Sequence, residues 1–83
     1  MTEEQEARIK RESTRMMRRY NAQGFVCPDG CSTRHYTSVV RDIIKKNVTS
    51  TLKKRKWGEL TERDLYFILH KVNDEVDEWF DWK

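Results

Sequence analysis

Apolar side chains recur at helical spacing in the last third of the chain and predict its best-defined element. Leu65, Leu69, Val72, Val76 and Trp79 follow one another at intervals of four, three, four and three residues. Such a repeat places its members on one face of a helix, which we expect over about 61–82. Thr61 and Asp64 occupy the positions of an N-terminal capping box, and Leu60 is placed to close the helix start as a hydrophobic staple.

A second helix is predicted over about 37–57 by an apolar residue at every fourth position. Its stripe consists of Val40, Ile44, Val48 and Leu52, with Ile43 alongside. Thr37 or Ser38 can cap its start, and Gly58 is placed to end it in the left-handed conformation. Because only a few residues separate this helix from the next, we expect an antiparallel hairpin with apolar face against apolar face.

Residues 1–22 predict a basic N-terminal helix with little to bury. Thr2 and Gln5 fit a capping box. The apolar stripe is narrow and consists of Ile9, Met16, Met17 and Tyr20. Residues 23–36 form a Cys-containing loop with a Pro-Asp-Gly turn between the cysteines. The sequence therefore predicts an all-α protein: a hairpin core over 37–83, joined by the loop to a basic helix that orders against a partner.

Charge is strongly segregated along the chain beneath a net charge of only +3. Residues 1–7 carry three acidic side chains and no basic one. Residues 8–57 carry 14 basic and 3 acidic side chains, whereas residues 58–83 carry 3 basic and 8 acidic ones. This distribution favours contact of the middle segment with a polyanion, neutralisation within the chain, or head-to-tail pairing with a second copy.

The basic middle of the chain makes nucleic acid the first candidate partner. The candidate contact residues are Arg11, Arg15, Arg18, Arg19, Lys45, Lys46, Lys53, Lys54, Arg55 and Lys56. Guanidinium and ammonium groups bind phosphates, and Tyr20, Tyr36 and Trp57 lie close enough in sequence to stack on bases. The alternative is a solvated basic surface with no ligand. A recognition helix at 61–82 is disfavoured, since its outward face would bring carboxylates to the phosphates.

The acidic face of the last helix offers a second candidate function, the docking of a protein partner. Its residues are Phe67, Asp74, Asp77, Glu78, Asp81 and Trp82. Aromatic rings among carboxylates suit a basic, grooved protein surface, as in an inhibitor or an adaptor. The alternative is intramolecular: the same carboxylates face the arginines of the first helix and hold it against the core.

Cys27, Cys31, His35 and His70 form a third candidate site, a zinc centre. Thiolates and imidazoles are the ligands that zinc prefers, but the spacing between these cysteines differs from the common zinc motifs. A disulfide across the turn and two reduced, packed cysteines are the alternatives, and the last is favoured in a reducing compartment. We therefore expect no cofactor, with zinc kept as the exception.

Nothing in the sequence indicates an enzyme, because no catalytic triad order and no phosphate-binding glycine loop is present. No apolar run is long enough to cross a bilayer, so we expect a cytoplasmic protein, or a nuclear one in a eukaryotic host. In its short length, thin core and divided charge the chain resembles in type the small regulators made by phages and viruses. The expected partner is nucleic acid or a larger nucleic-acid-handling protein, and a homodimer would complete the core.

Overall fold

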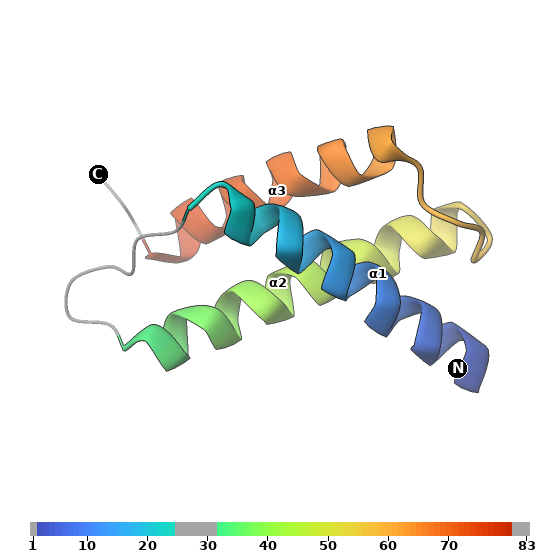
Figure 1. The fold of residues 1–83 in the computed structure, drawn as a ribbon, viewed down its shortest axis with the longest axis horizontal. Coiled ribbons are helices and arrows are strands. Elements are labelled where there is room, and N and C mark those ends of the chain that lie inside the picture. Colours follow the sequence, from blue (N-terminus) through green and yellow to red (C-terminus); the bar gives the residue numbers. More distant parts are fainter. Residues whose placement is uncertain (1, 25–31, 81–83) are drawn as a thin grey trace.

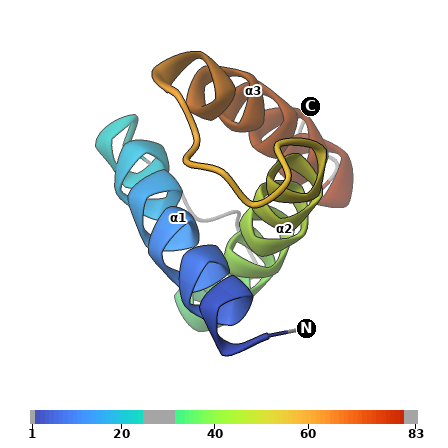
Figure 2. The ribbon, with the colours of Figure 1, turned by 90° about the vertical axis from the view of Figure 1, so that its right-hand side faces the viewer.

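The computed structural model describes residues 2–24 and 32–80, and within them the protein is all-α. The three helices are α1 (Glu3–Ala22), α2 (Thr33–Lys54) and α3 (Glu62–Phe80). Each helix contacts the other two. Figure 1 shows α2 and α3 running in opposite directions with α1 lying across them, and Figure 2 shows α3 above α1 and α2.

The helices begin at side chains that cap the free backbone N–H groups of the first turn. Thr2 and Gln5 form the predicted capping box, as each side chain accepts a hydrogen bond from the backbone N–H of the other at 3.1 Å. The same reciprocal pattern joins Thr61 and Asp64, at 3.0 and 3.1 Å. Both predicted capping boxes are therefore confirmed.

The start predicted for α2 is wrong by four residues. Ser32 is the N-cap, and its Oγ accepts a hydrogen bond from the backbone N–H of His35 at 3.1 Å. The helix consequently begins at Thr33 rather than near Thr37. Serine is as good a cap as the later candidates, and the earlier start gains one further turn that buries Tyr36.

The end of α2 also differs from the prediction. Gly58 does not adopt the left-handed conformation; Lys56 and Trp57 do, with φ of 54° and 65°. The backbone N–H of Trp57 donates to the carbonyl oxygen of Leu52 at 2.8 Å, which satisfies a terminal carbonyl of the helix. The positive φ that suits glycine occurs instead at Gly24, after α1, with φ of 76°.

The hydrophobic core takes side chains from all three helices and from Leu60. Its buried apolar residues are Ile9, Met16, Tyr20, Tyr36, Val40, Ile43, Ile44, Val48, Leu52, Leu60, Leu65, Ile68, Val72 and Val76. All five residues of the predicted α2 stripe are among them. On α3 the prediction is wrong at two positions: Leu69 is only partly buried while Ile68 is buried, and Trp79 is 62% exposed.

The core also encloses polar groups that are hydrogen-bonded. The hydroxyls of Tyr20 and Tyr36 lie 2.5 Å apart and join α1 to α2. The pKa of Tyr20 is raised, chiefly because the side chain is buried and secondly because of this hydrogen bond. Asn47 lies on the buried face of α2, where its Nδ2 donates to the carbonyl oxygen of Ile43 at 2.9 Å and to Glu75 Oε1 at 3.1 Å. These bonds satisfy groups that would otherwise be costly to bury.

Candidate nucleic-acid interface

The basic residues predicted to contact nucleic acid fall into two groups. One group forms ion pairs with carboxylates and consists of Arg15, Arg19, Lys46 and Arg55. The other group is exposed and forms no ion pair among the residues that the structure describes: Arg11, Arg18, Lys45, Lys53, Lys54 and Lys56. Cations that appear equivalent in the sequence therefore differ in their availability to a phosphate.

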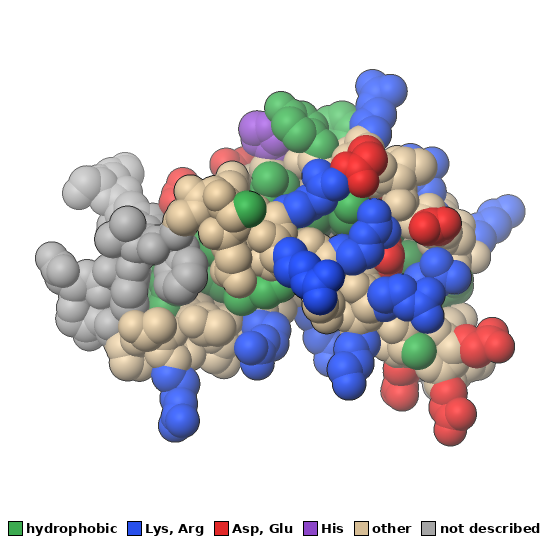
Figure 3. All heavy atoms as spheres, in the orientation of Figure 1, with side chains coloured by type: hydrophobic (Ala, Val, Ile, Leu, Met, Phe, Trp, Pro, Cys, Tyr) green, Lys and Arg blue, Asp and Glu red, His purple; other side chains and the backbone are tan. Residues whose placement is uncertain are grey.

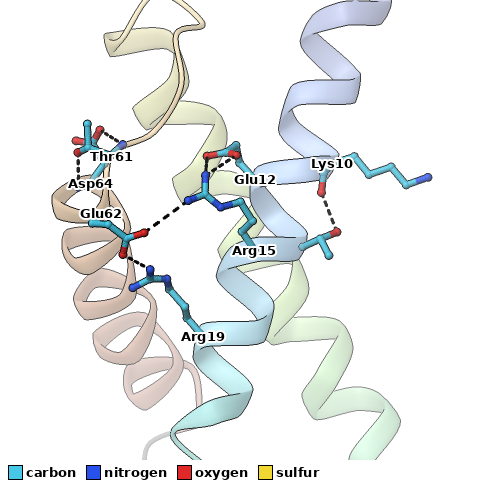
Figure 4. Close-up of polar contacts among 8 residues, drawn as sticks. Lys10, Glu12, Arg15, Arg19, Thr61, Glu62 and Asp64 are labelled. Atoms are coloured by element: carbon cyan, nitrogen blue, oxygen red, sulfur yellow. Dashed lines mark hydrogen bonds and ion pairs between the residues drawn. The ribbon is translucent and has the colours of Figure 1, made fainter.

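Two arginines of α1 reach across to the first residue of α3. Arg19 pairs with Glu62, and Arg15 Nη2 lies 3.8 Å from Glu62 Oε1. Figure 4 shows both arginines directed at Glu62, while the side chain of Lys10 points away on the other side of α1. Because Glu62 lies in the first turn of α3, its negative charge is also favoured by the helix dipole. This part of the basic surface is thus neutralised within the chain.

Arg15 also pairs with a carboxylate that lies inside the protein. Glu12 is only 1% exposed, and both of its oxygens accept hydrogen bonds from Arg15 Nη1 at 3.0 Å. The hydrogen bond to Glu12 is the largest cause of a raised pKa at Arg15. A buried carboxylate without a cation would be strongly destabilising, so Arg15 is committed to a structural contact.

Two further ion pairs join α2 to α3. Arg55 Nη2 donates to Asp64 Oδ1 at 2.6 Å, and this hydrogen bond is the main cause that holds the pKa of Asp64 below its usual range. Lys46 Nζ donates to Glu75 Oε2 at 2.7 Å. Burial raises the pKa of Glu75, but the hydrogen bonds from Lys46 and Asn47 and the positive charges of Lys46 and Lys71 together outweigh it and lower the pKa.

An open groove of about 1300 Å³ lies between α1 and α2 and is bordered by some of the unpaired cations of α2; we call it the basic groove. Its charged lining comprises Lys10, Arg41, Lys45, Lys46 and Lys53, with Glu6 as the one carboxylate. Ile9, Met17 and Ile44 supply apolar surface between them. Figure 3 shows the Lys and Arg side chains gathered over α1 and along the side of the molecule where α2 lies. Apart from Lys46, none of these cations forms an ion pair among the described residues.

Lys10 and Arg41 belong to the basic groove but were not among the predicted contact residues. A signal for Arg41 is present in the sequence, because Arg41, Lys45 and Lys53 share the every-fourth-residue spacing that places side chains on one strip of a helix. The sequence contains no comparable signal for Lys10. Lys10 lines the basic groove only because of the rotation of α1 about its axis, which is set by tertiary contacts.

The aromatic residues predicted to stack on bases are placed elsewhere. Tyr20 and Tyr36 are buried and hydrogen-bonded to each other, and Trp57 is partly buried against the core. The expectation of base stacking by the two tyrosines is therefore wrong. The basic groove presents cations and aliphatic surface, a composition suited to the phosphate backbone rather than to the faces of bases.

The residues predicted for protein docking are exposed where they are described. Phe67, Asp74, Asp77 and Glu78 all lie on the surface of α3, and none of the three carboxylates forms an ion pair among the described residues. Asp81 and Trp82 lie outside the described residues. The carboxylates that pair with cations of α1 or with the cations Lys46 and Arg55 are instead Glu62, Asp64 and Glu75 of α3, so Asp74, Asp77 and Glu78 hold neither helix by an ion pair.

The structure does not bring the two histidines of the predicted zinc centre together. His35 contacts Phe80 at the end of α3, with ring centroids 6.2 Å apart, whereas His70 packs against Tyr66, at 4.8 Å. Ten residues of helix separate Phe80 from His70, or about 15 Å along the axis. Cys27 and Cys31 lie outside the described residues, within which no cluster of three metal-ligating side chains occurs.

The three helices contain no segment with the length and apolar character needed to cross a membrane, over the residues described. No protein-family model matches the chain, and neither a known protein nor a solved structure is similar enough to count as a match. The arrangement of its own residues is thus the basis for any functional assignment.

Proposed function

We propose that the protein is a non-enzymatic regulatory protein that binds the backbone of nucleic acid in the basic groove. The observation that carries the proposal is the convergence of five cations from two helices, Lys10, Arg41, Lys45, Lys46 and Lys53, on one groove. Four of them have no carboxylate partner among the described residues. Unpaired cations in a concave surface favour a polyanion, because binding releases counterions from its phosphates.

The chemistry of the groove favours double-stranded nucleic acid. Single strands are bound on exposed aromatic platforms, and the two tyrosines nearest to the basic segments, Tyr20 and Tyr36, are buried in the core. Lysines that contact phosphates carry no sequence information by themselves, so the expected binding is largely independent of sequence. Arg11 and Arg18, exposed on α1, would extend the contact beyond the groove.

Fluorescence anisotropy with a labelled duplex of about 20 base pairs and the matching single strand tests the proposal, over about 50 to 200 mM salt. We expect duplex affinity to fall steeply with salt and to exceed single-strand affinity. The double variant Lys45→Glu/Lys53→Glu should lose roughly 100-fold in duplex affinity at the lowest salt.

Lys71→Glu supplies the control for the single variant Lys45→Glu, because it makes the same charge change on the exposed surface of α3. Lys45→Glu should weaken binding by roughly tenfold and Lys71→Glu by less than about threefold. Equal losses of duplex affinity in the two variants would show an effect of net charge alone. That result would overturn the assignment of the basic groove as the binding site. Binding that does not respond to salt would overturn the proposal as a whole.

A further inference from the structure

A second line of regularly spaced side chains runs along the outside of α3, which we call the outer α3 stripe. It consists of Arg63, Phe67, His70, Asp74 and Asp77. Their spacing of four, three, four and three residues is the spacing of a helix seam that faces another helix. All five are exposed, although the opposite side of α3 already builds the core. The stripe is therefore a seam without a partner in the described chain.

The middle of the outer α3 stripe is an aromatic cluster. Tyr66 and Phe67 are 58% and 55% exposed, and their ring centroids lie 6.2 Å apart. Tyr66 also packs edge-on against His70, at 4.8 Å, and the Arg63 guanidinium lies 5.9 Å from the centre of the Phe67 ring. Figure 3 shows hydrophobic side chains beside a histidine at the edge of the molecule where α3 lies. Rings held in contact before binding lose little entropy on association.

The charges at the two ends of the stripe are opposite. Arg63 lies at its N-terminal end, whereas Asp74 and Asp77 lie at its C-terminal end, and none of them forms an ion pair among the described residues. A helix with this distribution is complementary to a copy of itself running in the opposite direction. A different protein with a uniformly basic helix would match the two carboxylates but would meet Arg63 with a like charge.

We infer that the outer α3 stripe is the contact between two copies of this chain, packed antiparallel about a two-fold axis near His70. Arg63 and Asp77 are each seven residues from His70, about 10.5 Å along the helix, so the axis sets Arg63 opposite the other copy's Asp77. Tyr66 and Asp74 are each four residues from it, which brings the Tyr66 hydroxyl to the other copy's Asp74. A parallel pair would instead oppose like charges. The basic groove belongs to α1 and α2 and stays open in such a dimer.

Sedimentation equilibrium over roughly 1 to 500 µM tests this inference, since a contact of single helices is small and its dimer dissociates in the micromolar range. Arg63→Glu and Asp77→Arg should each weaken the dimer by at least about tenfold. The double variant Arg63→Glu/Asp77→Arg exchanges the two charges and should restore the dissociation constant to within about threefold of the unmodified value.

Phe67→Ala and Trp79→Ala form a matched pair, because each removes a large exposed aromatic side chain from α3 and only the first lies on the stripe. Phe67→Ala should weaken the dimer by roughly tenfold, and Trp79→Ala should leave it unchanged. A chain that remains monomeric at the highest concentration would overturn the inference. So would a dimer that the charge exchange fails to restore, or one that Trp79→Ala weakens as much as Phe67→Ala. None of these results depends on nucleic-acid binding.

Discussion

The two sides of α1 differ in whether their positive charges are paired with carboxylates. Towards α3, Arg15 and Arg19 lie against Glu62, and Arg15 also holds the buried Glu12. Towards α2, Lys10 lines a groove in which Arg41 and Lys45 have no ion pair among the described residues. One helix thus supplies cations that stabilise the fold and a cation that remains available to a ligand. Net charge counted along a segment cannot separate these two uses.

The difference follows from where the carboxylates lie. The first turn of α3 carries Glu62 and Asp64, which face the neighbouring helices and bind Arg19 and Arg55. The side of α2 that lines the basic groove has no acidic residue. Of the carboxylates in these pairs, Asp64 is buried and Glu62 is exposed, so removal of the cation should cost more at Asp64 than at Glu62. The exposed cations of the groove are screened by salt and interact weakly with one another.

The largest effect is expected from Arg15→Ala, which leaves the Glu12 carboxylate buried without its cation. We expect the free energy of unfolding to fall by about 3 kcal/mol, measured by urea denaturation monitored by circular dichroism. Arg11→Ala removes an exposed arginine of the same helix and should change stability by less than about 0.5 kcal/mol. A loss as small for Arg15→Ala as for Arg11→Ala would show that α1 does not depend on this pair.

An intermediate effect is expected from Asp64→Asn, which keeps the shape of the capping side chain but removes its charge. The loss should be about 1.5 kcal/mol at neutral pH, since a charged hydrogen bond to Arg55 is replaced by a neutral one. Asp42→Asn, an exposed change on α2, is the control and should have almost no effect.

The same residue predicts a dependence on acid. The pKa of Asp64 is lowered in the folded chain, so its stabilisation is complete above the unfolded pKa of about 3.9 and is lost as pH falls through the lower folded value. Stability of the unmodified chain should therefore decline below about pH 4, and the decline should be shallower in Asp64→Asn. Identical acid profiles for the two proteins would contradict this assignment.

The smallest change in stability is expected from Glu62→Gln, which removes the carboxylate that pairs with the arginines of α1 on the side facing α3. Glu62 is exposed, so the loss should be about 0.5 kcal/mol. If the basic groove binds nucleic acid, release of Arg19 should raise duplex affinity by roughly threefold and steepen its salt dependence, while Arg15 stays paired with Glu12. Glu78→Gln makes the same change in net charge without an ion pair among the described residues and should raise affinity less. Equal gains in duplex affinity for the two variants would indicate an effect of net charge alone.

Local pattern was enough to predict the all-α class, the capping boxes at Thr2 and Thr61, and the buried stripe of α2. These features depend on residues within one or two turns of each other, and the sequence contains both partners. The end of α2 could not be predicted in the same way. Gly58 was the obvious candidate, but Trp57 packs partly against the core and takes the left-handed conformation itself.

The contacts between helices were beyond the reach of local pattern. Trp79 continues the 4–3 repeat of α3, but burial also requires a neighbour at that height, and it is Phe80 that meets Tyr36 of α2, with ring centroids 5.2 Å apart. The sequence shows which segments are basic. It does not show which cations are paired, because pairing depends on distances such as that from Arg55 to Asp64. Those distances exist only once the helices are packed.

The hydrogen bond between Tyr20 and Tyr36 has a consequence for the geometry of ligand binding. Rotation of α1 by one residue position would turn Tyr20 through about 100° and separate the two hydroxyls, which lie 2.5 Å apart inside the protein. The Glu12–Arg15 pair lies within α1 and turns with the helix, so it does not distinguish one rotation from another. The same rotation decides whether Lys10 faces α2. A hydrogen bond between two buried phenols thus fixes the orientation of a wall of the basic groove.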